Sequence, residues 1–293
     1  MSDIGLCERR FRSYHKLEQE TDVLIQSILM EIRRMFSSKE FKIAVFMAGI
    51  IVFGQFCQNF YYMIHGINNV SIFEKWIGVR EENFASVVFF WLFPILAVFP
   101  YGWTMCEELH NGYAAQVMIR NGKKNYFIGK MLASFISGGI VTAGVLMLDF
   151  VILTMMFPTC YPRTNDLFCG IWPGHFCSIL FYEHPFLYVF LWTGVVFLWG
   201  GAIAVLGCAL GFLVKNTVVL FPTVWLLCVG ETILSEFMPL KQNGMNVETG
   251  WLKLLYADTP SLNPAWVIFG SIAVILMVAV TIFVMKGSHH EVL

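Results

Sequence analysis

Six long apolar runs dominate this sequence, and they constrain its fold more than any other feature. A membrane-spanning helix needs about 20 apolar residues to cross a hydrocarbon layer of about 30 Å, and each run reaches that length. The chain is 57% hydrophobic and only 13% charged, whereas soluble domains carry about 25% charged residues. We therefore expect an all-α polytopic membrane protein with six transmembrane helices. The expected helices are Phe41 to Ile64, Phe84 to Thr104, Phe127 to Phe157, Pro185 to Val214, Thr217 to Glu236 and Pro264 to Met285.

A stretch before the first run, Glu20 to Ser38, has the pattern of an amphipathic helix. Glu31, Arg33 and Arg34 fall largely on the face opposite its apolar residues. The stretch is too polar to span a membrane, so we expect it to lie along the cytoplasmic interface. A packed helix of a small cytosolic domain is the alternative. The apolar residues that recur at helical spacing are Leu24, Ile25, Ile28, Leu29, Ile32, Met35 and Phe36.

The basic residues predict how the chain is oriented. With the N-terminus inside, 14 of the 19 Lys and Arg residues fall in inside segments. This bias favours both termini in the cytoplasm of a multi-pass cell (plasma) membrane protein. We expect a cytoplasmic segment with the amphipathic helix over 1–40, a six-helix transmembrane domain over 41–286 and a cytoplasmic tail over 287–293. The five outside residues are Lys75, Arg80, Arg163, Lys241 and Lys253.

The polar stretch from Cys106 to Lys130 separates the second and third apolar runs. It opens with an acidic pair, has a glycine four residues after the second acid, and ends in a basic turn. A short cytosolic helix with an exposed apolar patch can dock into a groove of another protein. The alternative is a solvated loop whose lysines only enforce the topology. We expect a helix from Glu107 to Ile119, followed by the basic turn. The candidate docking residues are Glu107, Glu108, Gly112, Tyr113, Val117, Lys123 and Lys124.

This layout resembles the first cytoplasmic loop of ABC-2-type transporter membrane (permease) subunits. Members of that family commonly have an acidic residue, a glycine about four residues later, a basic turn and a Gly-Lys pair, here Gly129-Lys130, at the start of the third helix. The six-run layout and the N-terminal amphipathic "elbow" helix are similar too. The resemblance implies a coupling helix held in a cleft of a separate ATP-binding subunit, which would bind ATP and magnesium.

The resemblance also implies a function and partners. Such a chain would pair with a second permease subunit, the same or related, and export an amphipathic or hydrophobic cargo such as a peptide antibiotic, a drug or a lipid. A non-transporting membrane sensor or immunity protein with the same fold is the alternative. The net charge of −1 gives no indication of a nucleic-acid partner.

The chain carries no ATP site of its own. A P-loop requires G-x-x-x-x-G-K-[ST], but Gly129-Lys130 is followed by Met131, and Lys124 stands where the first glycine is needed. The Glu-Glu pairs lack the arginine of the E-E-x-x-x-R motif of intramembrane proteases. We therefore expect no enzyme, no cofactor and no metal site in this chain.

Acids near the outer ends of the apolar runs are candidates for an outer vestibule. Asp149 lies late in the third run, and Glu231 and Glu236 lie late in the fifth. Ionisable residues in apolar runs are costly in lipid and often functional. Solvated or interfacial acids without a special role are the alternative.

Three cysteines share one expected outer loop: Cys160, Cys169 and Cys177. One disulfide can form among them, in any of three pairings. Three free thiols are the alternative.

Overall fold

Helices make up nearly all of the structure, a computed structural model that describes residues 21–65, 71–79, 84–162, 171–172, 174–242, 244–255 and 261–289. Residues 1–20 of the expected N-terminal segment and 290–293 of the expected tail lie outside these ranges. A helix over residues 21–37 comes first. It is followed by α2 (Lys39–Ile64), α3 (Ile72–Lys75), α4 (Phe84–Val98), α5 (Thr104–His110), α6 (Tyr113–Asn121), α7 (Lys123–Met156), α8 (Ser178–Glu183), α9 (Pro185–Leu210), α10 (Thr217–Phe237) and α11 (Ala265–His289).

A small hairpin interrupts the helical pattern between α10 and α11. Strands β1 (Leu240–Gln242) and β2 (Met245–Val247) pair antiparallel, with Leu240 opposite Val247. A short 3-10 helix, Lys253–Leu255, follows them. Gly244 has φ of 82°, a left-handed conformation that glycine adopts without steric cost and that suits the tight turn of the hairpin.

Five helices are long and apolar enough to cross a membrane: α2, α7, α9, α10 and α11. The remaining expected span, Phe84 to Thr104, is the second along the chain and is not one continuous helix. Within it α4 has 15 residues, about 22 Å at 1.5 Å per residue, which is shorter than a full span.

The chain turns over residues 99–103 before α5 begins. Two residues in this turn account for the break. Pro100 has no N–H to continue the helical hydrogen bonds. Gly102 packs so closely on α9 that an added Cβ would lie 2.9 Å from the Ala204 carbonyl oxygen.

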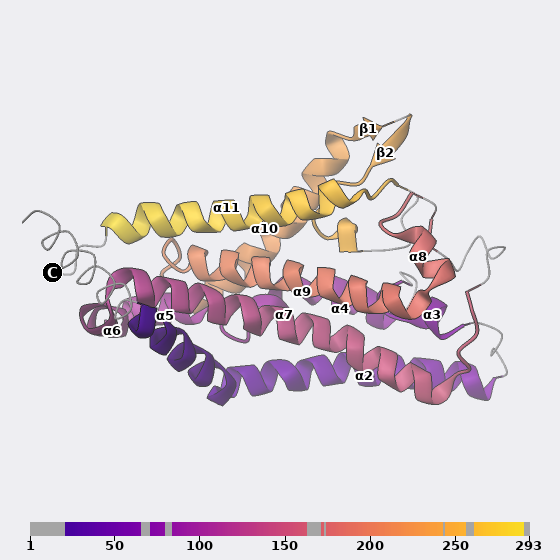
Figure 1. Cartoon of the computed structure of the whole chain (residues 1–293), viewed down its shortest axis with the longest axis horizontal. Coiled ribbons are helices and arrows are strands. Elements are labelled where there is room, and N and C mark those ends of the chain that lie inside the picture. The colour runs from indigo at the N-terminus through magenta and orange to yellow at the C-terminus, as the bar shows by residue number, and fades with distance from the viewer. Residues whose placement is uncertain are drawn as a thin grey trace, which may run out of the picture.

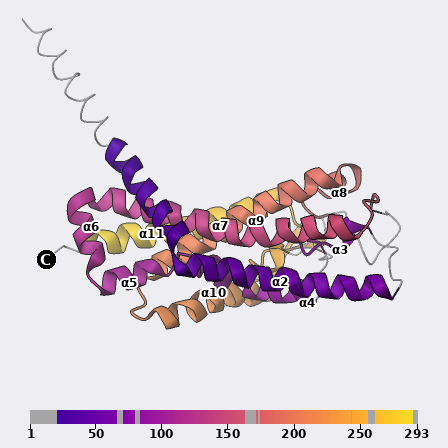
Figure 2. The same cartoon turned by 90° about the horizontal axis from the view of Figure 1, so that it is seen from below.

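The long helices lie roughly along one axis (Figure 1). Helix α7 packs between α2 and α9, α9 also contacts α11, and α4 packs against α2, α7, α9 and α10. Helices α5 and α6 lie at one end of the bundle, whereas α3, α8 and the hairpin lie at the opposite end. We call these ends the α6 end and the α8 end. The helix over residues 21–37, drawn in indigo, leaves the bundle at an angle (Figure 2).

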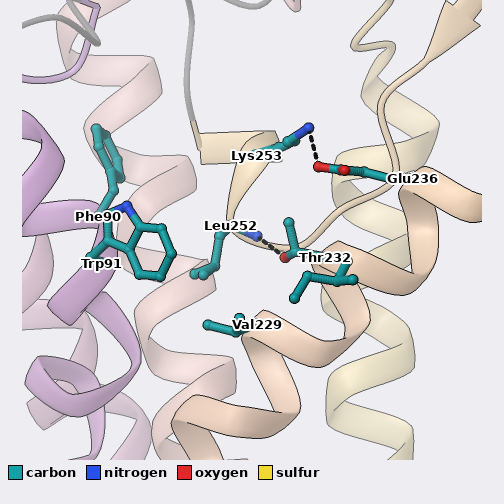
Figure 3. Close-up of a pocket in the computed structure, with 8 residues that line it drawn as sticks. Phe90, Trp91, Val229, Thr232, Glu236, Leu252 and Lys253 are labelled. Atoms are coloured by element: carbon teal, nitrogen blue, oxygen red, sulfur yellow. Dashed lines mark hydrogen bonds and ion pairs between the residues drawn. The ribbon is translucent and has the colours of Figure 1, made fainter.

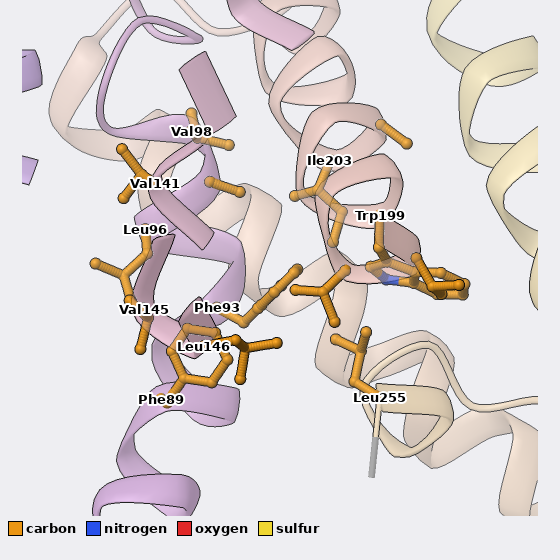
Figure 4. Close-up of a cluster of buried hydrophobic side chains, with 14 of the residues drawn as sticks. Phe89, Phe93, Leu96, Val98, Val141, Val145, Leu146, Trp199, Ile203 and Leu255 are labelled. Carbon is orange, nitrogen blue, oxygen red and sulfur yellow. The ribbon is translucent and has the colours of Figure 1, made fainter. Parts of the chain in front are cut away.

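The core is densest where α4, α7 and α9 meet (Figure 4). Phe93 of α4, Leu146 of α7 and Trp199 of α9 are all fully buried there. Small residues bring α7 and α9 together: an added Cβ on Gly138 would lie 2.5 Å from the Ala204 Cβ and 2.7 Å from a carbonyl oxygen of α4. Close approach of backbones over glycine is a common basis of helix association in lipid.

This contact predicts a position-specific effect within α7. Gly138→Ala should destabilise the fold by about 1–3 kcal/mol, because the new methyl group overpacks a backbone contact. Gly144→Ala is the matched control, since an added Cβ there meets nothing within 4 Å. Thermal unfolding of the purified variants in detergent measures both. Equal unfolding temperatures for the two variants would contradict the close packing of α7 on α9.

Candidate functional site

Four charged side chains meet at the α6 end, and we call them the buried charge cluster; three of them are buried, whereas the fourth, Arg34, is 44% exposed. Lys130 of α7 is fully buried. Its ammonium lies 2.7 Å from Glu108 Oε1 of α5 and 3.4 Å from Glu31 Oε2 of the helix over residues 21–37. Arg34 lies one helical turn after Glu31, and its guanidinium contacts the same Glu108 oxygen at 2.5 Å. Two carboxylates thus face two cations, so the cluster is electrically balanced.

Two tyrosine hydroxyls add hydrogen bonds to the cluster, although Glu31 Oε1 is buried without a hydrogen-bond partner. Tyr101 donates to Glu31 Oε2, and Tyr126 donates to Glu108 Oε2, both at 2.5 Å. The Lys130 ammonium also lies 4.5 Å from the centre of the Tyr101 ring, within the range of a cation–π interaction. Buried charges are tolerated when they are paired and hydrogen-bonded in this way.

The Gly-Lys pair at the start of α7 is explained by this cluster. An added Cβ on Gly129 would lie 3.4 Å from the Ser27 carbonyl oxygen and 3.5 Å from the Glu31 Cγ. Gly129 therefore marks where the helix over residues 21–37 rests on α7, although a Cβ there would make only ordinary van der Waals contacts. Lys130, the next residue, then reaches both carboxylates.

The helix over residues 21–37 packs on the bundle with an unexpected face. Ser27, Glu31 and Met35 recur every four residues, share one face and are all buried. Leu29 and Phe36 are exposed. The expectation that Glu31 lies on an outward polar face is therefore wrong. Periodicity alone did not show that this acid has a buried lysine as its partner.

The expected helix from Glu107 to Ile119 is divided in two. Gly112 joins α5 to α6 with φ of 71°, and Gly122 ends α6 with φ of 80°. Both are left-handed conformations that suit glycine. An added Cβ on Gly112 meets nothing within 4 Å, so this glycine is needed for its backbone conformation and not for close approach. Of the two lysines that begin α7, Lys124 is exposed and Lys123 is half-buried.

The predicted docking residues do not share one surface. Glu108 is buried in the charge cluster, and Val117 is only 9% exposed, so the expected exposed patch around Val117 is wrong. Tyr113 is 36% exposed and carries the Arg34 guanidinium 4.7 Å above its ring. Ile119, which was not among the predicted docking residues, is 72% exposed. We call the outward surface of α6 the α6 face; it consists of Tyr113, Gln116, Ile119 and Arg120.

Arg34 and Cys106, both at the α6 end, have a raised pKa. Burial opposes the charged form of Arg34, but the Glu108 carboxylate and other negative neighbours outweigh it and raise its pKa. Burial raises the pKa of the Cys106 thiol, which donates to the Val214 carbonyl oxygen at 3.0 Å. Both groups therefore stay protonated near neutral pH, so Cys106 is not a reactive thiolate.

The acids predicted for an outer vestibule have three separate roles at the α8 end. Asp149 is 1% exposed and accepts a hydrogen bond from the Ile77 N–H at 3.0 Å, so it does not line a vestibule. Glu231 accepts from the Trp251 N–H at 2.7 Å. Glu236 forms an ion pair with Lys253 at 2.5 Å. Only Glu236 is exposed to the outside of the molecule.

The predicted disulfide is not formed between the cysteines that the structure describes. Cys160 is an exposed free thiol, and Cys177 is a half-buried free thiol. Cys169 lies outside the described residues. Burial raises the pKa of the Cys177 thiol.

The described residues form no metal site, and the chain matches no known family. In the described part of the chain, no three His, Cys, Asp or Glu side chains are grouped so that they could hold a metal ion. Comparisons with protein-family models, with curated proteins and with solved structures gave no match to this chain.

The buried charge cluster predicts a large effect of Lys130. Lys130→Gln should destabilise the fold by about 3–5 kcal/mol, because it leaves buried carboxylates without their cation. Lys124→Gln, an exposed change in the same helix, should change stability by less than about 0.5 kcal/mol. Thermal unfolding in detergent compares them. Wild-type stability of Lys130→Gln would mean that the cluster is not closed as described.

Proposed function

We propose that this chain is the membrane-spanning permease subunit of an ABC-2-type ATP-driven exporter. A separate ATP-binding subunit, carrying ATP and magnesium, would supply the energy, because the sequence has no P-loop of its own. The observation that carries the proposal is the buried charge cluster, which joins the α5–α6 segment to the long helix α7. A partner that moves the α6 face would therefore move α7 instead of bending a loose loop.

The α6 face has the chemistry of a docking surface. Ile119 and Tyr113 offer exposed apolar area, and the polar side chains of Gln116 and Arg120 are exposed on the same helix. Interfaces commonly have an apolar centre with a polar rim. An ATP-binding subunit would bury Ile119 at the centre, with Lys124 at the edge.

The helix contacts support transmission of movement from this face into the bundle. Glu108 of α5 is held by Lys130 of α7 at 2.7 Å. Helix α7 in turn packs on α9 through Gly138. Packed helices move as rigid elements with a few discrete arrangements, so displacement of the α6 face would shift α7 and α9 together.

The remaining parts of the proposal follow from the same assignment. The chain would lie in the plasma membrane with both termini in the cytoplasm and would pair with a second permease subunit. Its cargo would be amphipathic or hydrophobic. A sensor or immunity protein of the same fold would also dock a partner at the α6 face, but it would not couple ATP hydrolysis to cargo movement.

Replacement of Ile119 tests the docking surface. Ile119→Asp should leave the fold intact, because the side chain is exposed, but should weaken binding of the ATP-binding subunit at least about tenfold by placing an unpaired charge in the interface. The measurement is affinity purification of the tagged chain in mild detergent. Mass spectrometry identifies a co-purifying chain with a P-loop, and its ATP hydrolysis is assayed.

Lys286→Gln is the matched control, since it also lowers the net charge by one at an exposed position of the same end. It should retain the partner at the wild-type level. Normal recovery of the ATPase with Ile119→Asp, at wild-type expression, would contradict docking at the α6 face. Cargo-stimulated ATP hydrolysis without cargo movement in reconstituted vesicles would favour the sensor.

Thiol labelling tests the orientation. A membrane-impermeant maleimide should label Cys160 in intact cells, because this thiol is exposed at the α8 end and the basic-residue bias places that end outside. A cysteine introduced in place of Lys124 should be labelled only after the cells are permeabilised. The opposite pattern would place the α6 face outside the cell and exclude docking of a cytoplasmic ATPase.

A further inference from the structure

A cleft of about 210 Å³ lies between α4, α10 and the segment that leads to α11, far from the buried charge cluster, and the Glu236–Lys253 ion pair is part of its lining (Figure 3). Its deeper part is apolar, with Trp91 of α4 facing Val229 of α10 and Leu252 beside them. Its rim is charged and consists of Glu236 and Lys253. The cleft therefore combines an apolar channel with a polar mouth.

Hydrogen bonds hold the walls of the cleft in place. The Trp225 indole N–H donates to the Trp91 carbonyl oxygen at 2.9 Å, which fixes α10 against α4. The Leu252 N–H donates to Thr232 Oγ1 at 3.1 Å, which fixes the segment that leads to α11. The cleft is thus preformed, as ligand sites usually are.

The two rim charges can both be reached from outside. Glu236 and Lys253 lie 2.5 Å apart, and their side chains are 54% and 38% exposed. A ligand with one charge would leave one of the two rim residues facing a like charge. A ligand with an anionic and a cationic group side by side matches both.

The position of the rim along α10 indicates the kind of ligand. Glu236 lies 19 residues after Thr217, the first residue of α10, about 28 Å along the helix. That distance is close to the hydrocarbon thickness of a membrane, about 30 Å. The rim therefore reaches the level of lipid headgroups, whereas Val229, two helical turns earlier, lies at the level of acyl chains. Trp91 faces Val229 at this level and is half-exposed, so its ring offers apolar surface to such a chain (Figure 3).

We propose that this cleft binds a zwitterionic phospholipid. One acyl chain lies along Trp91, Val229 and Leu252. The phosphate contacts the Lys253 ammonium, and the headgroup amine contacts the Glu236 carboxylate. This binding needs no ATP-binding subunit, so it stands or falls separately from the proposed function.

Native mass spectrometry of the full chain in detergent tests the proposal. The protein is titrated with phosphatidylethanolamine and, separately, with phosphatidylglycerol of the same acyl chains. Phosphatidylethanolamine should fill one site at a concentration that leaves phosphatidylglycerol unbound. Glu236→Gln and Lys253→Gln should each weaken phosphatidylethanolamine binding about fivefold, the loss expected for one polar contact at an exposed site.

Two further variants separate the site from general effects. Lys241→Gln removes an exposed lysine of β1 outside the cleft and should bind phosphatidylethanolamine as the wild type does. Val229→Trp should fill the apolar part and lower the occupancy of the bound lipid with both rim charges intact. Thermal unfolding shows that each variant is folded.

Two outcomes would overturn the proposal. One is equal binding of the two lipids by the wild-type protein, which indicates annular lipid without a headgroup site. The other is tighter binding of phosphatidylglycerol that only Lys253→Gln weakens, which indicates a simple anion site. Neither outcome bears on the docking of an ATPase at the α6 face.

Discussion

The arrangement of the α6 end depends on the ion pairs that the buried ammonium of Lys130 forms. Removing an ammonium from water costs several kcal/mol, and good geometry with paired carboxylates is needed to offset it. The carboxylates come from two other helical elements, as Glu31 and Glu108. Satisfying one charge therefore fixes three elements relative to one another. The cluster fixes the relative positions of these three elements more precisely than apolar packing alone would.

Because of that arrangement, the α6 face is held rigidly against the bundle. Helix α6 has nine residues, too few for stable helix formation in isolation, so it relies on its contacts with α5 and α7. Its buried residues, including Ala114 and Val117, pack inward and leave Ile119 outward. A partner at Ile119 would therefore press on a surface that is already backed by the bundle. A flexible loop in the same place would absorb the movement.

Hydropathy and length predicted the five helices that are long and apolar enough to cross a membrane, because each apolar run is long and its ends are marked by polar residues. They did not predict the early end of α4, since Phe99, Tyr101 and Trp103 continue the apolar pattern through the turn. Periodicity predicted the helix over residues 21–37 and its two faces, but not which face packs on the bundle. Glu31 is buried because it pairs with Lys130. That partner lies 99 residues further along the chain. No local pattern contains that information.

The two ends of the molecule are connected through α4. The turn over residues 99–103 joins α4 directly to α5 and carries Tyr101, which hydrogen-bonds Glu31 of the charge cluster. Near its middle α4 supplies Trp91, a wall of the cleft, which contacts α10 through the Trp225 indole and the ring contact beside it. Helix α10 is the least buried of the candidate spans. It therefore supports the Trp91 wall of the cleft less firmly than a more buried helix would. Because α4 also packs closely on α7 and α9, a displacement of α5 that carried α4 along its axis would disturb the α7–α9 core together with the cleft.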